Sequence, residues 1–152
     1  MSHLTPAGLD SHLGFWLRYV SNHVSQAFAR KLEGEGVTVA EWVVIRELFE
    51  TEALAPSRLA GRMGMTRGAI SKLSDRLVNK ALVLRRDDPR DGRARSLALT
   101  PAARTLVSRL AALADLNESE FFGDLADEDR RTLERILRQI VERRGLKTLP
   151  VD

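Results

Sequence analysis

Cysteine is absent from this chain of 152 residues, which excludes disulfides, zinc sites built from thiolates and thiol-based redox sensing. No apolar run approaches the roughly 18 residues that span a bilayer, and the N-terminus lacks the basic and apolar regions of a signal peptide. Also missing are a glycine-rich phosphate loop, a Gly-x-Ser-x-Gly elbow and a His-Glu-x-x-His pair. The sequence therefore argues against an enzyme and predicts a soluble, cytoplasmic protein that does not associate with membranes and needs no cofactor.

Positive charge is concentrated in one segment of the chain. Residues 58–95 contain 11 lysines and arginines against four aspartates, a net charge of +7, while the whole chain carries only +3. The rest of the chain is therefore slightly acidic, and a basic segment on such a scaffold is typical of a module that faces DNA. A hydrophobic content of 43% is enough for one domain, or for one small domain with appended helices.

The residues after Gly64 predict a helix that is apolar on one side only. Thr66 can accept hydrogen bonds from the first free amides of this helix. Successive residues turn by about 100°, which places Ile70, Leu73 and Leu77 on one stripe. The opposite side is polar and carries Arg67, Gly68, Ser71, Lys72, Asp75 and Asn79. Such a face suits a helix that enters a DNA groove; the alternative is an ordinary solvated helix face.

Two strand-like runs, Leu82–Arg86 and Ala94–Leu99, follow this helix. The residues between them are rich in proline, aspartate and glycine, which favour turns, so the pattern predicts a hairpin. Five arginines lie between positions 85 and 95, more than a purely structural hairpin needs. Because arginine suits the narrow minor groove of DNA, helix and hairpin together predict a recognition helix followed by a basic wing.

The rest of the chain has a helical pattern. Apolar residues recur at three- and four-residue steps, and local signals such as the possible capping box of Thr38 and Glu41 mark the helix starts. Proline in a first turn and glycine after a last turn give further boundaries. Besides the helix after Thr66, the predicted helices cover residues 10–33, 38–49, 56–62, from 100–101 onward, and from about 127 to 145.

The terminal helices exceed what a lone winged helix-turn-helix requires. They are rich in leucine, phenylalanine and isoleucine, so we expect residues 10–33 and 101–146 to pack together and against a second subunit, beside a DNA-binding lobe over residues 38–99. Two-fold DNA binding needs two reading heads at a fixed spacing, which an apolar platform supplies. The alternative is that these helices only complete the core of a monomer.

With these features the chain resembles the MarR family of bacterial transcriptional regulators. The specific part of the resemblance runs from Ala55-Pro-Ser-Arg-Leu-Ala to Thr100-Pro101 and includes Asp91-Gly-Arg93 followed by Leu97-Ala-Leu-Thr100. The resemblance implies a mainly α fold with about six helices, a two- or three-stranded β wing, and terminal helices that form a dimerisation platform. The chain departs from the family pattern at Ala55, where a capping threonine or serine is frequent, and at Ala103, where a glycine is frequent.

The resemblance also implies which residues meet double-stranded DNA. Those that face the major groove are Thr66, Arg67, Gly68, Ser71 and Lys72. Either Arg90 or Arg93 serves the wing, and Asp91 holds the wing arginine or its own loop in shape. Ser57 and Arg76 resemble phosphate contacts.

Regulators of this family commonly bind small aromatic or phenolic effectors between the dimer helices and the DNA-binding lobe. The candidates to line such a pocket are His12, Trp16, Tyr19 and Trp42, which offer flat apolar faces with polar edges. The alternative is ordinary core and interface packing. His12 and His23 lie about 16 Å apart along one helix, too far to share a metal ion within one subunit, which leaves only a site between subunits.

The implied function is that of a ligand-responsive repressor that binds a pseudo-palindromic operator as a homodimer. The alternative is a constitutive architectural DNA-binding protein without an effector. Titrating an effector into a DNA complex separates the two, whereas salt dependence does not, because both release counterions.

Overall fold

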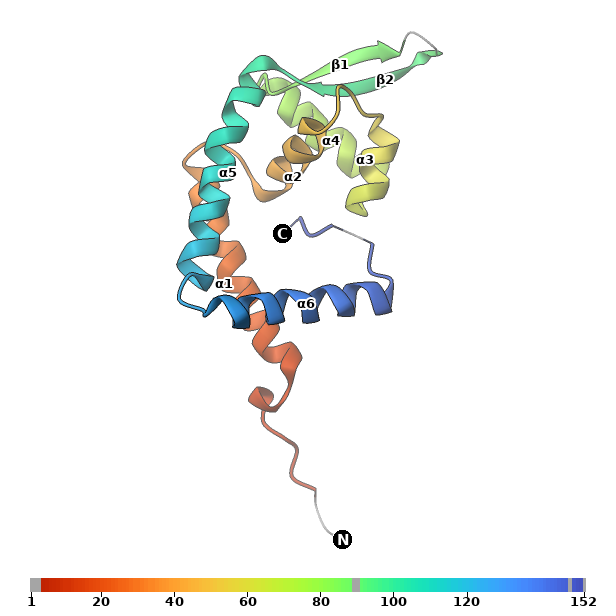
Figure 1. The fold of residues 1–152 in the computed structure, drawn as a ribbon. Coiled ribbons are helices and arrows are strands. Elements are labelled where there is room, and N and C mark those ends of the chain that lie inside the picture. The colour runs from red at the N-terminus through yellow and green to blue at the C-terminus, as the bar shows by residue number, and fades with distance from the viewer. Residues whose placement is uncertain (1–3, 89–90, 148, 152) are drawn as a thin grey trace.

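The computed structural model describes residues 4–88, 91–147 and 149–151. Within them the chain forms six α-helices and one two-stranded sheet (Figure 1). In chain order these are α1 (Leu13–Glu33), α2 (Val39–Phe49), α3 (Pro56–Met63), α4 (Arg67–Asn79), β1 (Val83–Asp88), β2 (Asp91–Leu99), α5 (Pro101–Phe122) and α6 (Asp127–Arg144). A single 3-10 turn, Leu9–Ser11, precedes α1. The predicted mainly α fold is confirmed.

Threonine hydroxyls start three of the helices. Thr38 accepts a hydrogen bond from the Glu41 amide at 3.1 Å, and the Glu41 carboxylate accepts one from the Thr38 amide at 2.9 Å, so the predicted capping box is confirmed. Thr66 and Thr100 each accept one amide hydrogen bond at 3.1 Å, at the starts of α4 and α5. Ala55 supplies no such bond, and α3 begins at Pro56, whose missing N–H needs no partner there.

The first helix begins three residues later than predicted. Residues 9–11 form the 3-10 turn, and His12 has an extended backbone with φ −109° and ψ 133°, so the α-helical hydrogen bonds start at Leu13. The apolar spacing alone did not reveal this break, because a 3-10 turn continues a three-residue step.

The hydrophobic core lies in the winged lobe and continues along α5. The predicted inward stripe of α4, Ile70, Leu73 and Leu77, is buried. Other buried apolar side chains come from α1, α2, α3, the sheet and α5: Leu32, Ile45, Leu48, Leu59, Met63, Val83, Leu97, Leu106 and Leu110. Burial of this stripe fixes which side of α4 faces outward, since a helix cannot turn both faces to the core.

The wing is a two-stranded antiparallel hairpin. Its register pairs Val83 with Leu99 and continues to Asp87 with Arg95. The strands extend beyond their predicted ends at the hairpin turn, since β1 ends at Asp88 and β2 begins at Asp91. A third strand is reduced to one residue, since only Leu54 pairs with Leu97, through two backbone hydrogen bonds of 2.8 and 2.9 Å. This bridge attaches the hairpin to the segment before α3.

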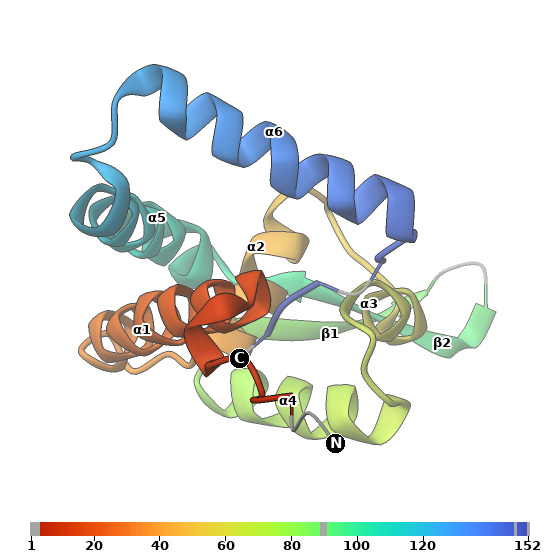
Figure 2. The ribbon, with the colours of Figure 1, turned by 90° about the horizontal axis from the view of Figure 1, so that it is seen from below.

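The terminal helices run in two directions: α1 and α5 extend downward from the lobe, and α6 crosses beneath it (Figure 1). α1 packs along α5, where the side-chain amide of Asn117 donates to the Val24 carbonyl at 3.1 Å and Lys31 donates to Glu120 at 2.8 Å. In contrast, α6, all of which the structure describes, has no buried residue, and Figure 2 shows it apart from α1. The expectation that the terminal helices pack together is correct for α1 and α5 and wrong for α6 within one subunit.

The turn after α4 contains the one non-glycine residue with positive φ among the described residues, Ala81 at 58°. The Leu82 amide donates to the Leu77 carbonyl at 3.0 Å, which makes this turn a Schellman motif, where glycine is the preferred residue. We expect Ala81→Gly to raise the free energy of unfolding by about 0.5 to 1 kcal/mol, because it removes the left-handed strain of a Cβ. Urea denaturation measures this change.

The matched control is Ala112→Gly, at an exposed position inside α5. It should lower the free energy of unfolding by about 1 kcal/mol, since glycine is less favourable than alanine by that amount inside a helix. Destabilisation by both substitutions would show that the turn at Ala81 carries no strain.

Candidate nucleic-acid interface

The polar face of α4 points away from the core, as the sequence predicts. Arg67, Gly68, Ser71 and Lys72 are all exposed, and they occupy the first half of the helix. Thr66 is also exposed, but its hydroxyl oxygen caps the helix. Figure 2 shows α4 on the opposite side of the lobe from α6. This leaves the outer face of the helix open to a large partner.

Packing within the chain does not require a glycine at position 68. A Cβ built there would meet only the Thr66 hydroxyl, at 4.0 Å. Instead, the absence of a side chain at Gly68 leaves the helix backbone accessible beside Arg67 and Lys72, whose side chains are long and basic. Such a combination allows a backbone to come close to a groove while charged groups reach its edges.

Three of the five hairpin arginines are paired with carboxylates. Arg85 on β1 contacts Asp75 on α4, so one ion pair joins the wing to the recognition helix. Arg86 lies 3.6 Å from Glu52, and Arg95 lies 3.6 Å from Asp87 on the facing strand. These three arginines therefore have acidic neighbours within the subunit.

The wing residues proposed to touch DNA fall at the tip of the hairpin. Arg90 lies outside the described residues, and so do the side chains of Asp91 and Arg93. The backbone of Asp91 begins β2, opposite Asp88, where the register shifts. Their assignment to the minor groove remains a prediction from the sequence.

Arg76 and Ser57, the two residues predicted to contact phosphates, are both exposed. Ser57 is exposed in the first turn of α3. Arg76 lies on the flank of α4 with 52% of its side chain exposed, and one guanidinium nitrogen is 3.3 Å from the buried carboxylate of Glu41. The sequence does not identify Arg76 as a partner of Glu41, because the two residues are 35 positions apart.

Glu41 carries a titratable charge inside the lobe. Burial by itself raises its pKa, but hydrogen bonds from Lys80 and Thr38, together with the charge of Lys80, outweigh burial and hold the pKa below its ordinary value of 4.5. A carboxyl whose pKa is lowered on folding stabilises the fold above its unfolded-state pKa. This contribution is lost as the pH falls through its folded-state pKa.

Glu41→Gln should therefore lower the free energy of unfolding at neutral pH by about 1 to 3 kcal/mol. The difference from the unchanged protein should begin to shrink as the pH falls below the ordinary carboxyl pKa of 4.5, and it should vanish below the lowered pKa of the folded state, where both states protonate the carboxyl. Urea denaturation at neutral and acidic pH measures the two values. A difference that is as large in acid as at neutral pH would contradict the role of the charge.

The four residues proposed for an effector pocket fall into two groups. Trp16 and Tyr19 lie near the start of α1, 50% and 54% exposed, with ring centroids 6.5 Å apart. His12 precedes this group at the end of the 3-10 turn. Trp42 is half-buried against Phe28, 6.4 Å between centroids, and Phe28 lies about 18 Å along α1 from Trp16. One subunit therefore does not bring all four residues to one pocket.

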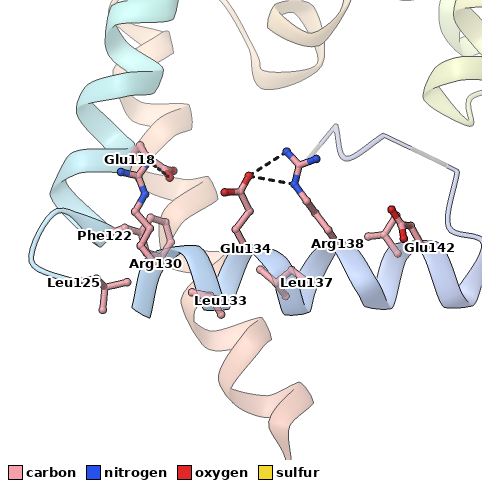
Figure 3. Close-up of a pocket in the computed structure, with 10 residues that line it drawn as sticks. Glu118, Phe122, Leu125, Arg130, Leu133, Glu134, Leu137, Arg138 and Glu142 are labelled. Carbon is pink, nitrogen blue, oxygen red and sulfur yellow. Dashed lines mark hydrogen bonds and ion pairs between the residues drawn. The ribbon is translucent and has the colours of Figure 1, made fainter. Parts of the chain in front are cut away.

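A separate groove lies between the end of α5 and α6 (Figure 3). It encloses about 520 Å³, and its apolar wall contains Phe122, Leu125, Leu133 and Leu137. The rim is charged: Arg138 donates two hydrogen bonds to Glu134, at 3.0 and 3.2 Å. No aromatic residue proposed for the effector pocket lines this groove, which belongs to the exposed side of α6.

The geometry defines a class of protein. Two helices joined by a glycine turn, α3 and α4, are followed by a basic hairpin, and the outer face of α4 is polar and exposed; this is a winged helix-turn-helix protein. None of the helices in the described part of the chain combines the length and apolar character needed to cross a bilayer.

Comparison with known proteins points to one family. The model of the MarR family matches residues 37–94. A putative transcriptional regulatory protein for the hcr operon of Thauera aromatica is 28% identical over 141 residues, which cover 92% of this chain and 85% of that protein. The segment that forms the helix-turn-helix and most of the wing therefore matches the MarR family, and over most of its length the chain is similar to a transcriptional regulator.

Solved structures agree with this assignment. A probable transcriptional regulator from Pseudomonas aeruginosa is 28% identical, with a TM-score of 0.77 over 88% of this chain and 99% of that one. CouR from Rhodococcus jostii RHA1, solved with p-coumaroyl-CoA, is 27% identical, with a TM-score of 0.77 over 89% of this chain and 95% of that one.

Proposed function

We propose that this protein is a homodimeric repressor that binds a pseudo-palindromic operator. The observation that carries the proposal is the exposed polar face of α4 beside a basic hairpin. In this proposal Arg67 and Ser71 read base edges in the major groove, and Thr66, Gly68 and Lys72 line the same face. Ser57 and Arg76 bind phosphates, and Arg90 or Arg93 enters the minor groove with Asp91 shaping the wing.

The unpartnered apolar faces of α1 and α6 support the dimer. On α6 the exposed apolar residues are Leu133, Ile136, Leu137, Ile140 and Val141, each 39–45% exposed, and on α1 they are Leu13, Trp16, Leu17 and Val20. Both stripes follow helical spacing, and neither is covered within the described part of the subunit. A second copy that covers them fixes two recognition helices at one spacing, as two-fold operators require.

A small aromatic effector is proposed to release the operator. Support comes from CouR, which was solved with an aromatic acyl thioester, and from the half-buried Phe28–Trp42 pair at the junction of α1 and α2. Such an effector must bind the DNA-competent and DNA-incompetent dimers unequally. By linkage, DNA must then weaken effector binding by the same factor.

Footprinting across the upstream region of the protein's own gene tests the proposal. A protected, pseudo-palindromic stretch is expected, and small aromatic acids or their coenzyme A thioesters should reverse the protection and perturb tryptophan fluorescence. Uniform weak protection of the whole region would contradict sequence-specific binding. Discrete protection that no compound in the panel reverses would instead support the constitutive, effector-free alternative.

A further inference from the structure

Glu41 is a buried carboxylate that contacts the recognition helix. It lies in the first turn of α2 with none of its surface exposed. Its Oε1 accepts hydrogen bonds from the Thr38 amide at 2.9 Å, from Lys80 at 2.9 Å and from Arg76 at 3.3 Å. One oxygen atom therefore joins the start of α2 to the second half of α4.

Lys80 connects Glu41 to the loop before α2. It is the C-cap residue of α4, and its ammonium also donates to the Gly36 carbonyl at 2.7 Å, in the loop before α2. The loop, α2 and α4 thus meet at two charged groups. Lys80 neutralises Glu41, so the cluster of Glu41, Lys80 and Arg76 keeps a net charge of +1 on the flank of α4, and a phosphate is still attracted to it.

Stability alone is a weak reason for this arrangement. The second carboxylate oxygen, Oε2, is buried and has no hydrogen-bond partner among the described residues. Burying a charge with an unpaired oxygen is costly, and well-packed apolar residues often serve a core equally well. The arrangement is better explained by what it does to Arg76.

The guanidinium of Arg76 contacts Glu41 through one nitrogen, and the rest of the side chain is partly exposed to solvent. One terminal nitrogen faces Glu41, while half of the side chain is exposed on the flank where the proposed function places a phosphate. The planar guanidinium has five donors in a fixed geometry, so fixing one edge also orients the rest. A side chain that is already oriented loses less conformational entropy when it binds.

We propose that Glu41 is a positioning residue for DNA binding, which holds the guanidinium of Arg76 in the orientation that meets a backbone phosphate. This inference rests on the proposed function, in which Arg76 is a phosphate contact. Glu41 itself touches no DNA. Its effect on affinity must therefore depend on Arg76 being present.

A double-mutant cycle on DNA binding tests this dependence. The probe is a fluorescently labelled duplex of random sequence, titrated with the full-length protein at several salt concentrations and at a temperature where every variant is folded. Arg76→Ala should weaken binding and reduce the slope of log K against log salt by about 1. Glu41→Gln should weaken binding about two- to fivefold in the otherwise unchanged protein. In the Arg76→Ala background it should have no effect.

Equal weakening by Glu41→Gln in both backgrounds, or no weakening in either, would overturn the inference, since a general loosening of the lobe acts regardless of Arg76. Failure of the unchanged protein to bind any duplex would instead overturn the proposed function. Glu50→Gln, which breaks an ion pair with Arg46 on the same helix, should leave binding unchanged. Should Glu41→Gln not fold, Glu41→Asp keeps the charge, retracts it from Arg76 and should reproduce the same pattern.

Discussion

Replacing Ile140 by glutamate will convert the protein to a monomer and lower its affinity for operator DNA by about 100-fold or more. Ile140 is 45% exposed in one subunit, so a new charge there leaves the core of the subunit intact. In the proposed dimer the same side chain is buried, and an unpaired buried charge opposes association strongly. Sedimentation velocity measures the oligomeric state, and a gel shift with the footprinted operator measures the affinity.

The matched control lies one residue earlier on the same helix. Gln139 belongs to the polar face of α6, next to Arg135 and Arg138, so Gln139→Glu adds the same charge away from the apolar stripe. It should leave the protein dimeric and its operator affinity unchanged. A dimer that persists in Ile140→Glu would show that α6 is not part of the interface.

Substitutions on α4 should separate reading of the sequence from anchoring to the backbone. Arg67→Ala and Ser71→Ala should each lower the preference for operator over random DNA by about 1 to 3 kcal/mol, because contacts to base edges carry the discrimination. Arg76→Ala should weaken both kinds of DNA alike, since phosphates are the same in every sequence. Competition binding with the two duplexes measures the preference.

Arg135→Ala is the control for loss of positive charge, because Arg135 lies on the polar side of α6, and Figure 2 shows α6 on the opposite side of the lobe from α4. It should alter neither affinity nor preference. Equal loss of affinity for both duplexes in all three α4 variants would indicate that the helix follows the backbone and does not read the sequence.

Most of the fold could be predicted because its boundaries depend on local chemistry. Thr38, Thr66 and Thr100 mark helix starts through hydrogen bonds that span only three residues. The inward stripe of α4 follows from the helical period. The 3-10 turn before α1 and the positive φ of Ala81 could not be predicted in this way, because the surrounding chain imposes them.

In the candidate site, too, the features that depend on local sequence could be predicted and the contacts between distant residues could not. The exposed face of α4 could be predicted, because a periodic apolar stripe also defines its opposite side. The contacts of Glu41 with Arg76 and of Asp75 with Arg85 join different elements and leave no periodic signal. One indication was available: Glu41 is a carboxylate in an otherwise apolar half of α2, and such a residue needs a cationic partner elsewhere.

Thr100 connects the end of the recognition helix α4 to the start of the long helix α5. Its hydroxyl donates to the Ala81 carbonyl at 2.8 Å, in the turn that ends α4, and accepts from the Ala103 amide at the start of α5. With 22 residues, α5 is a rod about 33 Å long, so tilting it by about 5° about its far end displaces this joint by about 3 Å. A displacement of that size is comparable to the length of a hydrogen bond. In the proposed two-fold dimer both recognition helices move, so the change in the distance between them is up to twice as large. In the proposed dimer, a molecule that tilts α5 by a few degrees would therefore release DNA without touching either recognition helix.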